Sequence, residues 1–292
     1  MSPEAGGWSS AAQLTLILTR RCQKACPECP VSAGAADMAP GTLKRALALF
    51  SEGRRKTGVV KFFGGEPLLR FDLVKSGLYQ LAANGYAGPV EVGTNGVLLD
   101  AARLRYFARR PGVQLNLNSS VTVNRRVAAL PNLVWNLLIP SQNPLSSLRV
   151  LARVLEASAG TPPRVNVLPA YYRHWGARPL LLLEKTLRRI RGLSEAGLLR
   201  LENAARFGPV PLFNGGLTVD ADGRCYNGNL ILAVKNCADA EALLAGDLNS
   251  PGREKLLRSW ADPSAVAKRI FGAEAVAGGL AADKLAETIL LG

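Results

Sequence analysis

The sequence predicts an α/β fold built on a parallel sheet, and two observations lead to this prediction. Short apolar runs typical of strands alternate with amphipathic stretches typical of helices through the first two thirds of the chain. Such alternation indicates parallel strands joined by crossover helices. The chain has 292 residues, of which 48% are hydrophobic and 20% charged, and this ordinary globular composition is sufficient for a sizeable core.

The predicted elements follow one another in a regular order. Strands are expected at residues 14–18, 59–63, 90–92, 113–118, 164–168 and 198–202. Helices are expected at residues 42–50, 71–83, 101–109, 143–157 and 180–191, where apolar residues recur at helical spacing. Asp100 is placed to cap the third helix. Residues 131–141 are only weakly patterned, and we interpret them as a connection.

The predicted strand at residues 113–118 has one polar face. Gln114, Asn116 and Asn118 alternate there with apolar residues. A strand inside a parallel sheet is usually apolar on both faces. The amides are therefore expected to line a wet interior or a ligand site, which Asn166 of the next predicted strand would share. An exposed antiparallel face gives the same alternation and remains an alternative.

A loop rich in cysteine follows the first predicted strand. Cys22, Cys26 and Cys29 lie within eight residues, and Pro27 and Pro30 disfavour a regular helix there. Iron–sulfur clusters are held by cysteine thiolates, normally four. Three ligands would leave one iron with an open position for chemistry. A structural zinc site or inert cysteines are the alternatives, although zinc normally takes four ligands in two pairs.

Two further segments occur in the order found in the radical S-adenosylmethionine (radical SAM) superfamily. Phe63-Gly64-Gly65-Glu66-Pro67 closes the second predicted strand, and Gly93-Thr94-Asn95-Gly96 closes the third. Together with Cys-x-x-x-Cys-x-x-Cys, these motifs resemble the signature of that superfamily over residues 14–100. The chain departs from the family pattern at Glu28, because the family usually has an aromatic residue before the last cysteine.

The resemblance implies a partial (β/α)6 TIM-like barrel over residues 12–208, with a [4Fe-4S] cluster on Cys22, Cys26 and Cys29 as the metal ligands. It also implies that S-adenosylmethionine binds beside the cluster, with the Gly-Gly-Glu-Pro segment close to its amino group. Glycines let backbone approach a ligand closely, and carbonyls or carboxylates accept hydrogen bonds from an ammonium group. The residues expected to bind this cofactor are Gly64, Gly65, Glu66, Pro67, Thr94, Asn95, Asn116, Asn118, Ser119 and Asn166. No catalytic residue is assigned.

The last third of the chain is expected to form a small α+β extension over residues 209–292, a β-hairpin followed by helices. Residues 217–226 have the pattern of two strands around an Asp-Gly turn. This order resembles, more weakly, the SPASM/twitch extension of peptide-modifying radical SAM enzymes, whose cysteines hold an auxiliary cluster. Only Cys225 and Cys237 are present here, too few for a four-ligand site. We therefore expect an extension without a cluster.

Charge and cysteine usage constrain partners and location. The net charge is +14, from 36 basic and 22 acidic residues, and this excess suits an acidic peptide or nucleic acid, or forms a solvated basic surface. No run of 18 apolar residues occurs, so no membrane partner is expected. Bunched cysteines and the lack of a secretory signal pattern favour a reducing compartment, the cytoplasm.

The resemblance implies an enzyme that cleaves S-adenosylmethionine reductively to a 5′-deoxyadenosyl radical, which abstracts a hydrogen atom from its substrate. The extension favours a peptide or protein substrate, and the family needs an electron donor such as flavodoxin or ferredoxin. Two alternatives remain open. The charge alone favours an enzyme that modifies RNA or nucleotides, and a non-catalytic partner subunit could keep the fold and bind peptide.

Overall fold

The computed structural model describes residues 13–26, 29, 31, 34–52, 58–118, 123–158, 160–170, 173–202, 216–235, 237–249 and 263–291. Two compact units make up the chain. The first consists of Met1–Gly93 and Leu212–Val266, and the second of Thr94–Pro211 and Ala267–Gly292. The expected domain boundary between residues 208 and 209 lies outside the described residues.

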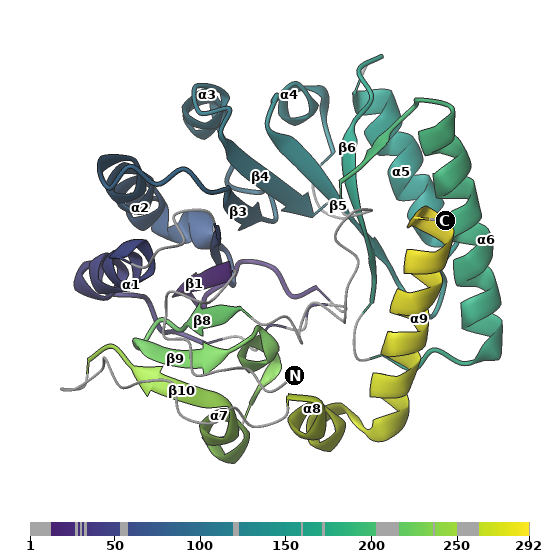
Figure 1. The fold of residues 1–292 in the computed structure, drawn as a ribbon. Coiled ribbons are helices and arrows are strands. Elements are labelled where there is room, and N and C mark those ends of the chain that lie inside the picture. Colours follow the sequence, from purple (N-terminus) through teal and green to yellow (C-terminus); the bar gives the residue numbers. More distant parts are fainter. Residues whose placement is uncertain are drawn as a thin grey trace. The chain divides into compact units, whose positions relative to one another are not determined.

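The first unit is a sheet with the strand order β10-β9-β8-β1-β2-β3. Its parallel part comprises β1 (Gln13–Thr19), β2 (Val59–Gly64), β3 (Val90–Thr94) and β8 (Leu217–Val219). Strands β9 (Arg224–Asn227) and β10 (Leu244–Asp247) add an antiparallel edge. The predicted hairpin is therefore confirmed, and it pairs directly with β1 although it lies far away in the sequence (Figure 1).

The helices of the first unit connect these strands. They are α1 (Pro40–Glu52), the 3-10 helix η2 (Pro67–Arg70), α2 (Phe71–Ala83), the 3-10 helix η5 (Leu230–Ala233) and α7 (Cys237–Leu243). Strand β1 carries the core of this unit, because Leu14, Leu16 and Leu18 are fully buried. Helices α1 and α2 pack against each other, and both follow the predicted ranges closely.

The second unit has the strand order β4-β5-β6-β7, all parallel. Its strands are β4 (Val113–Asn118), β5 (Leu133–Ile139), β6 (Arg164–Pro169) and β7 (Arg200–Leu201). The interpretation of residues 131–141 as a connection was wrong, because β5 occupies them. Leu133, Val134, Trp135, Leu137 and Ile139 are buried, so this strand lacks the simple alternation that would have revealed it.

The second unit's helices are α3 (Ala101–Ala108), α4 (Arg125–Ala128), α5 (Ser146–Ala157), α6 (Ala177–Glu195) and α9 (Ala273–Leu291). Asp100 caps α3 as predicted, since its side chain accepts a hydrogen bond from the amide of Arg103. Helix α9 lies beside α6 (Figure 1) and also contacts β6. Helix α8 (Pro263–Phe271) precedes α9.

The predicted fold class is confirmed, since parallel strands alternate with helices along the chain. Among the described residues, no helix combines the length and the apolar character that a membrane span requires.

Candidate functional site

The cysteine loop leaves β1 from a closed base. The amide of Arg20 donates to the carbonyl of Ala36 at 2.9 Å, and the amide of Gly34 donates back to the carbonyl of Arg20 at 3.2 Å. Two residues away on each segment, towards β1, the amide of Met38 donates to the carbonyl of Leu18. The two ends of the loop are thus hydrogen-bonded to each other, so the cysteines are carried by a loop with a fixed stem.

Cys22, Cys26 and Cys29 lie on this loop, and none of them forms a disulfide within the described part of the chain. Cys22 and Cys29 are exposed and Cys26 is half-buried. A backbone hydrogen bond from Cys29 to the carbonyl of Cys26 closes a turn at 3.0 Å, and the amide of Lys24 donates to the sulfur of Cys22 at 3.4 Å. Cysteine binds a metal as the thiolate.

The other two thiols of the loop act on Cys29. Although the residue is exposed as a whole, nearby chain atoms exclude part of the water around its sulfur and raise the pKa of Cys29, a backbone hydrogen bond from Val31 lowers it, and the negative charges of Cys26 and Cys22 raise it further. Mutual repulsion of this kind is what a bound cation relieves, because metal binding favours deprotonated ligands. Among the described residues, no three His, Cys, Asp or Glu side chains are gathered closely enough to hold a metal ion as they stand.

The Gly-Gly-Glu-Pro segment lies directly against the stem of this loop. Gly65 donates its amide to the carbonyl of Thr19 at 2.8 Å, and Glu66 donates to the carbonyl of Arg21 at 2.9 Å. A Cβ atom built on Gly65 would overlap the carbonyl oxygen of Arg21, and one on Gly64 would overlap that of Thr19. Gly64 also has a φ of 139°, a region that favours glycine. Only glycine allows the two segments to approach this closely.

The Glu66 side chain has a local partner. It is fully buried, and its Oε1 accepts a hydrogen bond from the amide of Leu68 at 3.0 Å, which caps η2. Pro67 occupies the first turn of the same helix, where a missing amide is tolerated. The carboxylate therefore fixes the shape of the segment that follows β2.

Asp37 joins the stem of the cysteine loop to η2, and it was not predicted from the sequence. Its carboxylate accepts from the Thr19 hydroxyl at 2.6 Å and from the Arg21 guanidinium at 2.9 and 2.6 Å, and it forms an ion pair with Arg70 of η2 at 3.6 Å. Burial opposes ionisation of Asp37, but the Thr19 and Arg21 hydrogen bonds outweigh it, so its pKa is lowered. No sequence motif marks this aspartate.

The second unit brings the predicted asparagines onto one face of its sheet. Asn118 of β4, Asn136 of β5 and Asn166 of β6 are in register with one another, and the Nδ2 of Asn166 donates to the Oδ1 of Asn136 at 3.0 Å. Asn116 lies two residues before Asn118 and shares its face. Asn136 was not predicted, because the strand that carries it was not recognised.

A charged group continues this polar face towards the start of the strands. Arg164 donates to Gln114 at 3.1 Å and pairs with Glu202 at 2.6 and 2.8 Å, while Gln114 donates to Asn116 at 2.9 Å. The polar residues of β4 are half-buried, whereas Val113, Leu115 and Leu117 on its other face are buried. The alternation in the sequence thus separates a packed face from a partly accessible polar one.

Thr94 is the last residue of β3, and Asn95 begins the turn that follows it. The Thr94 hydroxyl accepts from the amide of Gly96 at 3.0 Å, and the Asn95 side-chain oxygen accepts from the amide of Val97 at 3.0 Å. Both side chains are buried. The predicted site residues are therefore divided, with the cysteines and Gly64 to Pro67 in the first unit and Thr94, Asn95 and the asparagines in the second. Ser119 and Glu28 lie outside the described residues.

No protein-family model and no curated protein matches the chain. Solved structures do. With 12% identity and a TM-score of 0.64, the chain is similar to "Native anSMEcpe with bound AdoMet and Cp18Cys peptide", over 89% of this chain and 82% of that one. It is also similar to Streptococcus suis SuiB bound to precursor peptide SuiA, with 12% identity, a TM-score of 0.53 and coverage of 78% and 62%.

Both of these proteins are radical SAM enzymes. At 12% identity the similarity shows the fold, and the resemblance drawn from the cysteine, Gly-Gly-Glu-Pro and Thr-Asn motifs is confirmed at that level. The chain shares with these enzymes a mixed α/β fold with mostly parallel strands.

Proposed function

We propose that the chain is a radical SAM enzyme that acts on a peptide or protein. Cys22, Cys26 and Cys29 would hold a [4Fe-4S] cluster, and S-adenosylmethionine would bind at the iron that lacks a cysteine ligand. When bound, the cluster supplies the electron that cleaves S-adenosylmethionine to methionine and a 5′-deoxyadenosyl radical, the species that abstracts hydrogen from substrate in this superfamily.

One observation supports this proposal more than any other. Three cysteine thiols lie on one loop, and the Gly64-Gly65 backbone is hydrogen-bonded against the stem of that loop. These two motifs are separated in the sequence, and each is only moderately specific by itself. Their contact through carbonyls that only glycine can approach is the arrangement that a cofactor shared by both motifs would require.

The chain's own residues would bind and orient S-adenosylmethionine. Gly65 and Glu66 present a backbone that is locked to the loop stem, so groups of the cofactor that bind there are oriented relative to the thiols. Asn116 and Asn118 are candidates for the ribose hydroxyls, and Asn166 for the adenine or methionine end. Because Asn136 is in register with Asn118 and Asn166, it joins them as a candidate.

Two facts favour a peptide as the substrate. Among the similar structures, anSMEcpe is bound to a Cp18Cys peptide and SuiB to the precursor peptide SuiA. The net charge of +14 would attract an acidic peptide over distances of about a Debye length. The proposal also includes an electron donor such as flavodoxin or ferredoxin, a cytoplasmic location and a SPASM-like extension that carries no cluster.

The test is cleavage of S-adenosylmethionine. The anaerobically reconstituted protein is incubated with dithionite and S-adenosylmethionine, and 5′-deoxyadenosine is quantified by mass spectrometry. We expect the product from the wild type and none from Cys22→Ala. A protein that holds a [4Fe-4S] cluster but forms no 5′-deoxyadenosine with any peptide or RNA would favour the non-catalytic alternative.

The net charge also agrees with an enzyme that modifies RNA or nucleotides. Basic proteins also bind RNA, and that binding weakens with salt in the same way as binding to an acidic peptide. The substrate class is therefore decided by product analysis. We expect deuterium from a labelled acidic peptide to appear in 5′-deoxyadenosine, and transfer from RNA instead would overturn the peptide assignment.

A further inference from the structure

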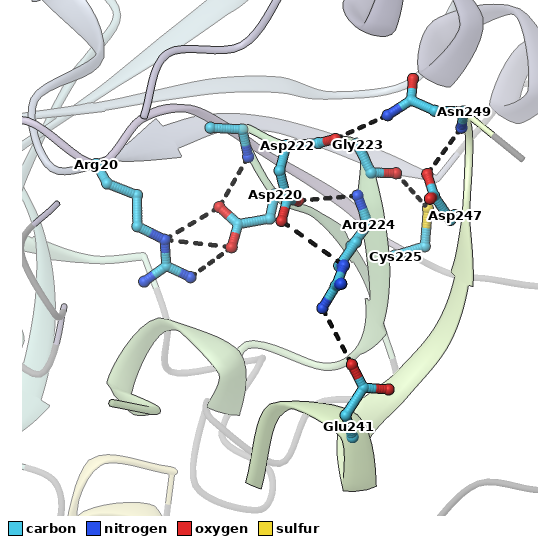
Figure 2. Close-up of polar contacts among 10 residues, drawn as sticks. Arg20, Asp220, Asp222, Gly223, Arg224, Cys225, Glu241, Asp247 and Asn249 are labelled. Atoms are coloured by element: carbon cyan, nitrogen blue, oxygen red, sulfur yellow. Dashed lines mark hydrogen bonds and ion pairs between the residues drawn. The ribbon is translucent and has the colours of Figure 1, made fainter. Parts of the chain in front are cut away.

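Arg20 links the cysteine loop to a distant part of the chain. Its backbone forms the stem of the loop through hydrogen bonds with Ala36 and Gly34. Its side chain points to the C-terminal hairpin, where Asp220 follows β8 (Figure 2). The residue that opens the loop is thus held by two separate sets of contacts.

The contact with Asp220 is bidentate and shielded. The Nε of Arg20 donates to both carboxylate oxygens at 3.1 and 3.2 Å, and its Nη2 donates to Oδ2 at 2.6 Å. The side chains are only 13% and 10% exposed, and Nη2 also donates to the carbonyl of Ile231 at 3.3 Å. Removing one partner of such a shielded pair is costly, because the charge of the other partner loses its counterion.

Asp220 is itself held in a rigid setting. Strand β8 pairs with β1 from Leu14 to Leu16, and the turn after Asp220 is tied to a helix by Asn249. The Nδ2 of Asn249 donates to the carbonyl of Asp222 at 2.8 Å, and its Oδ1 accepts from Arg45 of α1 at 2.6 Å. The hairpin turn therefore provides a fixed anchor for the Arg20 guanidinium.

The same hairpin carries a second ion pair, which joins it to α7. Arg224 pairs with Glu241 of α7 at 3.0 Å, and these side chains are 45% and 55% exposed (Figure 2). An exposed pair of this kind contributes little to stability. It offers a matched control, because the same chemical change can be made in both pairs.

We propose that Arg20 and Asp220 are positioning residues through which the C-terminal hairpin holds the stem of the cysteine loop. The hairpin then helps to fix the position of the cysteine loop. The expected effect of this contact on cluster binding rests on the proposed function. Its expected effect on the position of the loop does not.

Trypsin tests the positioning role in the metal-free protein. Cleavage after Arg20 requires that its side chain leave Asp220 and enter the protease. We expect Asp220→Asn to be cleaved after Arg20 about tenfold faster than the wild type, because local opening sets the rate. Glu241→Gln should match the wild type, and Asp220→Glu should recover most of the protection.

Cleavage in the second unit provides the reference for a general loss of stability. If Asp220→Asn raises cleavage after Arg188 of α6 as much as after Arg20, or leaves both unchanged, the positioning role is overturned. Should Asp220→Asn fail to fold, Arg20→Lys replaces it. Lysine keeps the charge and the trypsin site but loses the planar fork, so faster cleavage after residue 20 alone is again expected.

Iron retention tests the consequence for the cofactor. After anaerobic reconstitution, we expect Asp220→Asn to lose iron to a chelator several-fold faster than the wild type and Glu241→Gln to lose it at the wild-type rate. Equal rates in all three proteins would overturn the link between hairpin and cofactor. A wild type that binds no iron would refute the proposed function instead, and the trypsin result would still decide the role of the pair.

Discussion

At the scale of single residues, the contact between Gly65 and the loop stem determines whether the two motifs can share a ligand. The Gly65 amide is bonded to Thr19, and its Cα faces the Arg21 carbonyl with no space for a side chain. The sequence predicted a close backbone approach here, but towards a ligand. In the structure, Gly65 allows a close approach to the chain's own backbone at Thr19 and Arg21.

Gly65→Ala should therefore separate the two segments. The added methyl group overlaps backbone that cannot rotate away, and overpacking of this kind costs about 1–3 kcal/mol in the free energy of unfolding. We expect a lower midpoint in urea and weaker retention of iron after reconstitution. Both are measured on the same preparation.

Gly192→Ala is the matched control for this change. Gly192 is exposed within α6, and a Cβ atom there would meet nothing within 4 Å. Alanine in a helix interior is favoured over glycine by about 0.5–1 kcal/mol, so this variant should be slightly more stable and retain iron normally. A Gly65→Ala protein as stable as the wild type would show that the segments are not in tight contact.

At the scale of elements, the sequence predicted most helices and strands but missed β5. Residues 133–139 read Leu-Val-Trp-Asn-Leu-Leu-Ile, a short apolar run with one asparagine. Such a run has no period that distinguishes a strand from another buried segment. Asn136 was therefore not predicted either. A single amide in an apolar run becomes a candidate site residue only when the strand register places it beside Asn118 and Asn166.

Helix α9 carries a buried carboxyl group that no sequence pattern marks. Asp283 is 6% exposed, and within the described part of the chain its Oδ2 has no hydrogen-bond partner. Burial raises the pKa of Asp283 to about 7, and the charge of Glu287 one turn further along the helix adds to the effect. In the folded protein the carboxyl group is therefore harder to ionise than in the unfolded chain.

The stability of the protein should consequently depend on pH in a defined direction. Between the ordinary aspartate pKa of about 4 and the folded value of about 7, the folded state binds more protons, so the free energy of unfolding falls as the pH rises. Asp283→Asn removes this penalty. The free energy of unfolding of the variant, relative to that of the wild type, should be about 2 kcal/mol higher at pH 8 than at pH 5, as measured by urea unfolding.

Glu287→Gln provides the comparison within the same helix. It removes only the smaller cause of the shift, so its gain between pH 5 and pH 8 should have the same sign and be smaller. A gain for Asp283→Asn that is equal at both pH values would contradict the assignment of the titration to this residue.

At the scale of the whole molecule, the sequence could not predict where the C-terminal hairpin attaches. Its strands and its Asp-Gly turn were predicted from local pattern, because turn residues and alternation act over a few positions. Its pairing with β1 and the Arg20–Asp220 contact join residues 200 positions apart, and no local signal carries such information. The hairpin was expected as an appendage, and it forms part of the first unit's sheet.

This attachment bears on the two remaining cysteines. Cys225 lies on β9, fully buried, and its thiol donates to the carbonyl of Gly223 at 3.6 Å. Burial raises the pKa of Cys225, and the nearby charge of Asp247 raises it further, so the thiolate that a cluster needs is disfavoured. The side chain of Cys237 lies outside the described residues. Cys225 therefore has the surroundings of a packed core thiol.

We expect the reconstituted wild type to hold about four irons, all on the loop of Cys22, Cys26 and Cys29. The double variant Cys225→Ala and Cys237→Ala should hold the same number, since loss of a buried thiol changes packing and removes no ligand. The triple alanine variant of the loop should hold none. Iron and labile sulfide analysis distinguishes these proteins, and six to eight irons in the wild type, with the excess lost in the double variant, would place a second cluster in the extension.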